Sequence, residues 1–305
     1  MGVAEAGGHP VRVYHAGSLN AAIGQEIGPG FTAETGISVQ NVGGASVDLA
    51  NEIRSGRIRP DVFMSADAEV IDQVLLGPAN GDAARWYVIM CRQRMVLGYS
   101  RSSRFRAAFE AAAAGTRPWY EALQTPGLVL KRSDPRVDPG GYRGIFALAL
   151  AEAHYGIPGL KHAVLGDDEN AAQIGAGDYA ALKRGEIDAA ITYLTNAVGA
   201  SVPYVELPRE VDQSDPALAS SYATASYTTP LGQTFHGTPL VYGVTIPSAA
   251  PNPDDGAALV RYLLSEPGRG ALTRRGFLPS DVLVAGDESA VPPSLRALVQ
   301  GRHAP

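Results

Sequence analysis

Val11-Arg-Val-Tyr-His15 runs directly into Ala16-Gly-Ser-Leu-Asn20, and this stretch decides the fold. The first five residues have the composition of a strand, and the small residues after them form a turn that opens a helix. A helix start leaves backbone amides without partners, and beside the hydroxyl of Ser18 they can form an anion site. Every connection from a strand to a helix also requires a tight turn. On its own, this turn therefore predicts an α/β unit but no site.

Two further predicted strands end in the same kind of turn. Residues 37–42 lead into Gly43-Gly-Ala-Ser46, and residues 60–64 lead into Ser65-Ala-Asp67. Helix N-capping, which contributes about 1 kcal/mol and needs no ligand, accounts for each of the three serines taken alone. Three such turns at the ends of strands, where ligands bind in α/β sheets, favour a shared oxyanion site.

Strand-like and helix-like segments alternate from residue 11 onward, which predicts α/β layers with largely parallel strands. Asp138 followed by Pro139 is a good helix start, because aspartate caps free amides and proline lacks the amide that would be unpaired there. Helices are predicted at residues 19–35, 47–56, 68–76, 107–115, 145–155, 178–184, 252–264 and 266–276. Later strands are predicted at residues 127–131, 187–193, 221–228 and 238–247.

The length of 305 residues suits two lobes better than one core. Residues 86–99 carry two short apolar runs and are expected to cross between the lobes, and a second crossing is expected at Pro239. Lobe one then comprises residues 11–98 and 240–305, and the inserted lobe two comprises residues 99–239. Two crossings make a hinge, and the cleft between two hinged lobes is the expected place for a ligand.

The composition excludes several classes of protein. Hydrophobic residues make up 45% and charged residues 18%, as in a packed globular protein. No run approaches the roughly 18 apolar residues of a membrane span. The net charge of -6 and the absence of a basic run argue against a nucleic-acid partner. The single cysteine, Cys91, excludes an internal disulfide and multi-cysteine metal sites, and its apolar flanks predict a buried thiol.

Catalytic signatures are missing from the sequence. We find none of the motifs G-x-S-x-G, H-E-x-x-H, G-x-x-x-x-G-K-[S/T] or G-x-G-x-x-G. His15 and Ser18 lie three residues apart across a tight turn, which does not favour a base and nucleophile pair, and the other histidines lack ligand spacing. We therefore expect a binding protein rather than an enzyme, with no cofactor.

Several segments, in order along almost the entire chain, resemble the substrate-binding proteins of ABC importers for molybdate and tungstate, in their archaeal form. They include His15-Ala-Gly-Ser-Leu19, Asp61-Val-Phe-Met-Ser-Ala-Asp67, Asp138-Pro-Gly-Gly-Tyr-Arg143, Gly185-Glu-Ile-Asp188 with Tyr193, and Pro239-Leu-Val-Tyr-Gly-Val-Thr-Ile-Pro247. The resemblance implies an α/β type II periplasmic-binding fold, whose two lobes close on an oxyanion that is then passed to the membrane permease.

The resemblance also implies the residues of the site. Ser18 and Ser65 would donate hydroxyl and backbone N–H bonds, and Asp138 would be one of two carboxylates that ligate the metal of the bound oxyanion. Gly140 and Gly141 would present backbone amides beside Asp138. The complete oxyanion-binding set that we expect is Ser18, Ser46, Ser65, Asp138, Gly140, Gly141, Lys183 and Tyr193.

The chain departs from the family pattern at Lys183. Family members carry the second carboxylate in a segment resembling Leu-Glu-x-Gly, whereas this chain has Leu182-Lys-Arg-Gly185. Two explanations are open. Lys183 is a solvated residue in the last turn of a helix, where a cation suits the helix dipole, or it reaches the cleft and donates to an anion oxygen. Loss of the second carboxylate keeps sulfate as an alternative ligand, because sulfur does not expand its coordination.

We therefore expect an extracytoplasmic protein that captures molybdate or tungstate and delivers it to an ABC permease. The sequence as given starts Met1-Gly-Val-Ala4 without a leader, and the expected location is the periplasm or the outer face of the membrane. The expected membrane contact is a lipid anchor or the permease itself, and the expected state is a monomer. The alternatives are a binder of sulfate or another tetrahedral oxyanion, and a cytoplasmic oxyanion sensor on the same fold.

Overall fold

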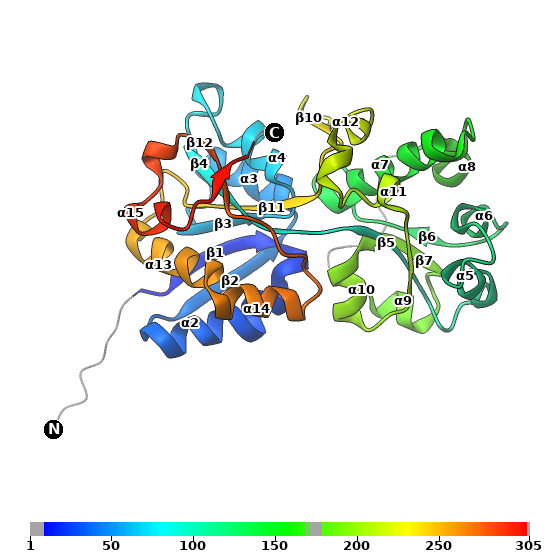
Figure 1. Cartoon of the computed structure of the whole chain (residues 1–305), viewed down its shortest axis with the longest axis horizontal. Coiled ribbons are helices and arrows are strands. Elements are labelled where there is room, and N and C mark those ends of the chain that lie inside the picture. Colours follow the sequence, from blue (N-terminus) through cyan, green and yellow to red (C-terminus); the bar gives the residue numbers. More distant parts are fainter. Residues whose placement is uncertain (1–8, 169, 171–178, 304–305) are drawn as a thin grey trace. The chain divides into compact units, whose positions relative to one another are not determined.

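The computed structural model describes residues 9–168, 170 and 179–303, which divide into two compact units (Figure 1). Unit 1 contains the described residues up to Cys91 and those from Val241 onward, and unit 2 is Arg92–Leu240. The second boundary lies within one residue of the expected one. The first boundary was expected after residue 98 and lies after residue 91, because the strand β5 (Met95–Tyr99) pairs with strands of unit 2.

Unit 1 is built on a sheet with the strand order β13-β12-β4-β11-β3-β1-β2. Strand β1 (Val11–Ala16) is parallel to both β2 (Val39–Gly44) and β3 (Val62–Ser65), so these three strands end at the same edge of the sheet. Strand β11 (Val241–Thr245) runs antiparallel beside β3. The remaining strands of this sheet are β4 (Trp86–Arg92), β12 (Leu283–Gly286) and β13 (Gly301–Arg302).

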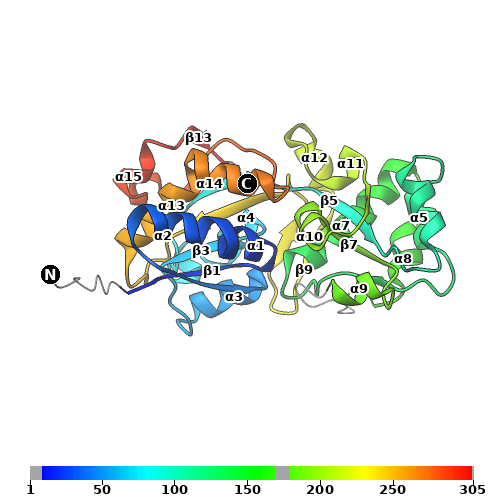
Figure 2. The ribbon, with the colours of Figure 1, turned by 90° about the horizontal axis from the view of Figure 1, so that it is seen from below.

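Helices cover both faces of this sheet. Figure 1 shows α3 and α4 on one face and α2, α13 and α14 on the other, and Figure 2 shows α2 and α3 on opposite sides of β1. The bounds are α2 (Gly28–Thr35), α3 (Ser46–Arg54), α4 (Ala68–Val74), α13 (Pro253–Leu264), α14 (Glu266–Arg274) and α15 (Pro293–Arg296). These confirm the helices predicted at 47–56, 68–76, 252–264 and 266–276.

The helix predicted at 19–35 is confirmed but is not uniform. It consists of a 3-10 turn (Gly17–Leu19), α1 (Asn20–Ala22), a π-helical stretch (Ile23–Ile27) and α2. It ends at Gly36, whose φ of 77° is left-handed, a conformation that glycine adopts without strain. The turn after β1 therefore opens a helix, as predicted.

Unit 2 contains a four-stranded sheet with the order β6-β7-β5-β8 and a separate hairpin of β9 and β10. Strand β7 (Ala189–Tyr193) is parallel to β6 (Leu130–Lys131) and antiparallel to β5. Three predicted strands are thus present but shorter, because only part of residues 127–131, 187–193 and 221–228 forms ladder hydrogen bonds. The other strands are β8 (Tyr204–Glu206), β9 (Ser226–Thr228) and β10 (Thr234–His236).

The central helix of unit 2 is α7 (Pro139–Tyr155). It begins directly after Asp138, the predicted helix start, and runs without interruption into the predicted apolar segment 145–155. Helix α9 (Ala180–Arg184) ends at Gly185 as predicted, and Asp178, its predicted start, lies outside the described residues. The remaining helices are α5 (Arg106–Ala113), α6 (Trp119–Leu123), α8 (Leu160–Leu165), α10 (Leu194–Ala200), α11 (Arg209–Asp212) and α12 (Ala219–Tyr222).

Two further observations concern Cys91 and the apolar character of the helices. Cys91 is 2% exposed, and burial raises the pKa of its thiol, so it is the buried thiol that the sequence predicts. Among the described residues, no helix combines the length and the apolar character that crossing a bilayer requires.

Candidate functional site

The three predicted serines lie at one edge of the unit 1 sheet, which we call the serine edge (Ser18, Ser46 and Ser65). Ser18 follows β1, Ser46 begins α3 just after β2, and Ser65 ends β3. The hydroxyl oxygen of Ser46 accepts a hydrogen bond from the backbone amide of Ala66 at 3.1 Å. This bond joins the loops after β2 and β3. The structure therefore brings the three turns together, as the pattern of parallel strands predicts.

The N-capping explanation is wrong for all three serines. The N-cap of α4 is Asp67, whose carboxylate accepts the Glu69 amide at 3.2 Å. Ser65 instead closes a turn, because its hydroxyl accepts from the Asp67 amide at 3.2 Å and donates to the Asp67 carbonyl at 2.6 Å. Ser46 lies inside α3, and Ser18 lies inside the 3-10 turn, with no side-chain cap at either helix start.

The three hydroxyls differ in their availability to a ligand. Ser46 and Ser65 are both buried, so their hydrogen bonds and not their exposure distinguish them. The Ser65 proton is already donated to the Asp67 carbonyl, which disfavours the expected donation from its hydroxyl to an anion. Ser46 accepts through its oxygen, and none of the hydrogen bonds among the described residues uses its own proton. Ser18 is half-buried and shares a hydrogen bond of 2.8 Å with the Tyr242 hydroxyl. The hydroxyl protons of Ser18 and Ser46 are therefore less committed than that of Ser65.

Tyr242 is a residue of the serine edge that the sequence did not single out. It lies on β11, whose next residue, Gly243, is paired with Ser65, and its ring packs edge-on against Phe277 with centroids 5.3 Å apart. The segment 239–247 carries the family resemblance, but the contact of Tyr242 with Ser18 joins residues 224 positions apart. A sequence pattern gives no signal for such a pair.

His15 does not act on Ser18. Its Nδ1 is 2.9 Å from the carbonyl oxygen of Ala16, and desolvation by burial lowers the pKa of the imidazole. The Ser18 hydroxyl bonds to Tyr242 instead. Neither hydroxyl donor of the serine edge is therefore bonded to a base, and the arrangement suits hydrogen-bond donation to an anion better than nucleophilic catalysis.

In unit 2, the start of α7 forms a second group of predicted residues, which we call the Asp138 cluster (Ser133, Asp138, Gly140 and Tyr193). Asp138 caps α7, and its Oδ1 accepts the Gly140 amide at 2.7 Å. A Cβ on Gly140 would lie 3.1 Å from that Oδ1, 3.4 Å from Ser133 Oγ and 3.4 Å from the Tyr193 ring. The predicted residues Asp138, Gly140 and Tyr193 are thus neighbours, and Ser133 is an addition.

Burial governs the ionisation of Asp138. The pKa of its carboxyl is raised to about 6, mainly by desolvation; the hydrogen bond from the Gly140 amide opposes this rise, and the negative charge of Asp134 adds to it. The pKa of this half-buried carboxyl therefore lies close to neutral pH. This makes it a distinctive group in an otherwise neutral cluster.

The amides of Gly140 and Gly141 are not available as expected. The Gly140 amide is bonded to the Asp138 carboxylate, and the Gly141 amide donates to the Asp138 carbonyl at 3.0 Å. Both donors close the cap of α7 because its first turn has no preceding carbonyls to bond. Close packing explains the glycine at position 141 instead, since a Cβ there would lie 2.4 Å from the backbone of Ser133 and Pro135.

Lys183 lies at the opposite end of β7 from the Asp138 cluster. Helix α9 runs back along β7, so that Tyr179 before it contacts Thr192, whereas Gly185 after it packs on Ser102. The Ser102 hydroxyl donates to the Lys183 carbonyl at 3.3 Å, and the Lys183 side chain is exposed. Four residues of strand, about 13 Å, separate the two ends. This position and exposure support the solvated explanation of Lys183 over the one in which its side chain reaches the bound anion.

A hydrogen-bonded trio at the end of β7 was missed. The Tyr179 hydroxyl is 2.6 Å from Thr192 Oγ1, and Asn196 Nδ2 donates to the same Oγ1 at 3.0 Å. Burial raises the pKa of Tyr179 to about 12, with a further contribution from the charge of Asp138. The charge of Asp138 is therefore felt on this side of β7 as well. Thr192 and Asn196 lie near the end of the strand predicted at residues 187–193, and this position is the only sign of the trio in the sequence.

The described residues also bear on metal binding. They contain no group of three or more His, Cys, Asp or Glu side chains that could hold a metal ion. Asp138 is the one predicted carboxylate ligand, and its cluster otherwise offers hydroxyl groups. Such a set does not build a resident metal centre from the described residues alone, but one carboxylate can contact a ligand that carries its own metal.

Solved structures share the fold of this chain. The periplasmic molybdate-binding protein of Azotobacter vinelandii superposes with a TM-score of 0.63 at 15% sequence identity, covering 88% of this chain and 99% of that one. This confirms the predicted α/β periplasmic-binding fold.

Sequence relatives and a family model agree with the fold. An uncharacterized solute-binding protein of Methanoculleus marisnigri is 31% identical over 319 residues, covering 95% of this chain and 86% of the relative. A putative ABC transporter molybdenum-binding protein of Haloferax volcanii is 34% identical over 235 residues, covering 77% of this chain and 72% of the relative. The family model of bacterial extracellular solute-binding proteins matches residues 11–278. The chain therefore belongs to the bacterial extracellular solute-binding protein family.

Proposed function

We propose that this protein captures molybdate or tungstate outside the cytoplasm and delivers it to the permease of an ABC importer. The observation that carries the proposal is the serine edge, where the hydroxyls of Ser18 and Ser46 lie together at the ends of parallel strands. The putative molybdenum-binding relative from Haloferax volcanii supports the choice of ligand.

Neutral donors are sufficient to bind such an anion. Hydrogen bonds from hydroxyls and amides to an ionised oxygen are charge-assisted and roughly twice as strong as neutral ones. Nanomolar affinity requires a net of about 12 kcal/mol, which several such bonds supply in a desolvated site. The negative net charge of the chain, -6, does not oppose this local binding, because the donors act at hydrogen-bond distance.

Asp138 supports molybdate or tungstate over sulfate. An ionised carboxylate repels a tetrahedral dianion unless it bonds to the central atom or shares a proton with the anion. Molybdenum and tungsten accept an additional carboxylate oxygen, whereas sulfur does not.

The biological setting follows from this proposal. The partners are the small oxyanion and the ABC permease, without a resident cofactor or a nucleic acid. The protein works as a monomer at the periplasmic or outer face of the membrane, in contact with the membrane through a lipid anchor or the permease. A cytoplasmic sensor is the competing setting, and fractionation of cells that express the complete gene separates the two.

Titration calorimetry tests the choice of ligand. The purified protein is titrated with molybdate, tungstate, sulfate and phosphate at one pH and ionic strength. We expect the first two anions to bind at least about a hundredfold more tightly than sulfate, a difference of about 2.7 kcal/mol. Sulfate binding as tight as molybdate binding would overturn the proposal in favour of a sulfate-binding protein.

A further inference from the structure

Unit 2 contains a chain of buried polar groups that starts in the helix of the Asp138 cluster. Arg143 lies in α7, five residues after Asp138, and is fully buried. Its guanidinium donates to the Thr238 carbonyl at 2.6 Å and to Thr238 Oγ1 at 2.8 Å. It also donates to Gln213 Oε1 at 3.1 Å, and Gln213 Nε2 donates back to the Arg143 carbonyl at 3.0 Å. Helix α7 is therefore bonded to residues 238–240.

The chain of bonds continues to a second helix. The Leu240 amide donates to the Gln213 carbonyl at 2.7 Å, and the Gln93 amide donates to the Leu240 carbonyl at 2.9 Å. Gln93 Nε2 then donates to Thr195 Oγ1 at 3.1 Å. Thr195 lies in the first turn of α10, two residues after Tyr193. We call this set the anchor network; it consists of Arg143, Gln213, Thr238, Leu240, Gln93 and Thr195.

The network meets the chain where it passes between the units. Gln93 follows the boundary after Cys91, and Leu240 precedes the boundary at Val241. We call residues 92–94 and 238–240 the crossing segments. Both helices that begin at the Asp138 cluster are thus bonded to a crossing segment within their first two turns. Helix α7 makes two hydrogen bonds to Thr238, and α10 makes one to Gln93.

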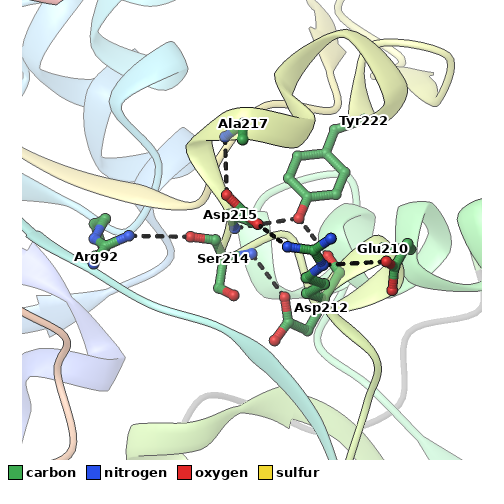
Figure 3. Close-up of polar contacts among 8 residues, drawn as sticks. Arg92, Glu210, Asp212, Ser214, Asp215, Ala217 and Tyr222 are labelled. Carbon is green, nitrogen blue, oxygen red and sulfur yellow. Dashed lines mark hydrogen bonds and ion pairs between the residues drawn. The ribbon is translucent and has the colours of Figure 1, made fainter.

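The turn that presents Gln213 is itself held in place (Figure 3). Gln213 has a φ of 62°, a left-handed conformation that is unusual outside glycine. Both neighbours in the turn are bonded. The Ser214 amide donates to the Asp212 carboxylate at 2.8 Å, and Arg92 of the first crossing segment donates to the Ser214 carbonyl at 3.4 Å. The strained backbone is therefore fixed by bonds to the same crossing segment, as such outliers often are at functional positions.

Stability alone is a poor explanation for this arrangement. Burying polar groups is costly unless every one is hydrogen-bonded, and apolar side chains of similar size usually stabilise a core as well. What a buried polar network adds is direction, since each bond is satisfied in only one relative placement of the elements. The network therefore specifies where the first turns of α7 and α10 lie with respect to the crossing segments.

We propose that Arg143, Thr238 and Thr195 are positioning residues for oxyanion binding, which hold the Asp138 cluster in its binding geometry through the crossing segments. This inference rests on the proposed function. The residues do not touch the anion. They act through the helices that carry Asp138 and Tyr193.

Matched threonine variants test the inference. Thr195→Val and Thr238→Val keep the shape of the side chain but remove the hydroxyl, whereas Thr195→Ser and Thr238→Ser keep the hydroxyl. The control is Ser103→Ala, which removes a buried bond of 2.6 Å to Asp188 at the other end of β7. Molybdate affinity is measured by calorimetry and Tm by circular dichroism. Hydrogen exchange of residues 139–142 and 194–197 is followed in the ligand-free protein.

We expect both valine variants to weaken molybdate binding about fivefold, the size of one lost hydrogen bond. They should also speed hydrogen exchange in the two first turns. Both serine variants should keep affinity and exchange, and Ser103→Ala should lower Tm alone. Valine variants that lower Tm with unchanged affinity and exchange would overturn the inference. A wild-type protein that binds no oxyanion would instead refute the proposed function, and exchange in the two turns would still decide the positioning role.

Discussion

The Ser46 hydroxyl oxygen accepts the backbone amide of Ala66 at 3.1 Å, and this bond joins the turns that follow two parallel strands. Ser46 therefore has two roles. Its oxygen fixes the loop after β3, and its proton is free of the hydrogen bonds found among the described residues. The hydroxyl of Ser65, by contrast, both donates to and accepts from the backbone of Asp67.

Ser46→Ala should weaken molybdate binding about tenfold and lower the free energy of unfolding by about 1 to 2 kcal/mol, because the Ala66 amide loses its acceptor. Ser55→Ala is the control, since Ser55 is exposed and its hydroxyl bonds only to the Glu52 carbonyl within the same helix end. Calorimetry and urea unfolding measure the two effects. Unchanged affinity in Ser46→Ala would remove Ser46 from the site.

Ser65→Ala should act mainly on stability. The variant leaves the Asp67 amide and carbonyl without their partner in a fully buried turn, which costs about 1 to 3 kcal/mol. Its loss of affinity should be smaller than that of Ser18→Ala, whose hydroxyl is half-buried. Urea unfolding and molybdate titration of both variants check the order. A greater loss of affinity in Ser65→Ala would restore its expected role as a donor.

Lys183→Glu should leave both affinity and ligand preference unchanged. The side chain is exposed at the end of α9, and the Lys183 carbonyl is bonded to Ser102 near the start of β7, whereas the Asp138 cluster lies at its end. Titration with molybdate and tungstate is the measurement, and Lys161→Glu on α8 provides a comparison of equal charge change. A shift of preference toward tungstate in Lys183→Glu alone would show that position 183 reaches the ligand.

Asp72 gives unit 1 a pH dependence that is independent of ligand. Burial raises the pKa of its carboxyl from 3.8 to about 6, although the hydrogen bond of 2.6 Å from Tyr87 lowers it. The folded protein then binds the proton more tightly than the unfolded chain, so this group lowers stability progressively as pH rises from about 4 to 6. Asp72→Asn removes the charge and keeps an acceptor for Tyr87.

We expect Asp72→Asn to be more stable than the wild type by about 1 to 3 kcal/mol at pH 7.5 and nearly equal to it below pH 4. Urea unfolding at several pH values measures the difference. A difference that does not vary with pH would mean that Asp72 is ionised equally in the folded and unfolded states.

Local sequence predicted most of the fold and part of the site. The strand and turn at residues 11–20, and the cap formed by Asp138, are visible because they depend on neighbouring residues. The end of α9 at Gly185 is visible for the same reason. The two explanations for Lys183 stayed open in the sequence because its position depends on the direction in which α9 runs along β7, which a short motif does not encode. Tyr242 escaped notice because its partner, Ser18, is 224 residues away.

The first unit boundary shows the same limit. Residues 86–99 read as one apolar stretch, and the pattern does not reveal that β4 joins one sheet and β5 another. The amides of Gly140 and Gly141 were predicted to face a ligand, because the motif shows where the amides lie. It does not show that the carboxylate and the carbonyl of Asp138 accept hydrogen bonds from them. The sequence pattern therefore predicts the type of an element better than the strand or residue with which it pairs.

An anomalous difference map of crystals grown with tungstate tests the central claim most directly. We predict one strong tungsten peak at an anion whose oxygens accept hydrogen bonds from the hydroxyls of Ser18 and Ser46. No peak at the serine edge, or a peak bound only by other residues, would contradict the account.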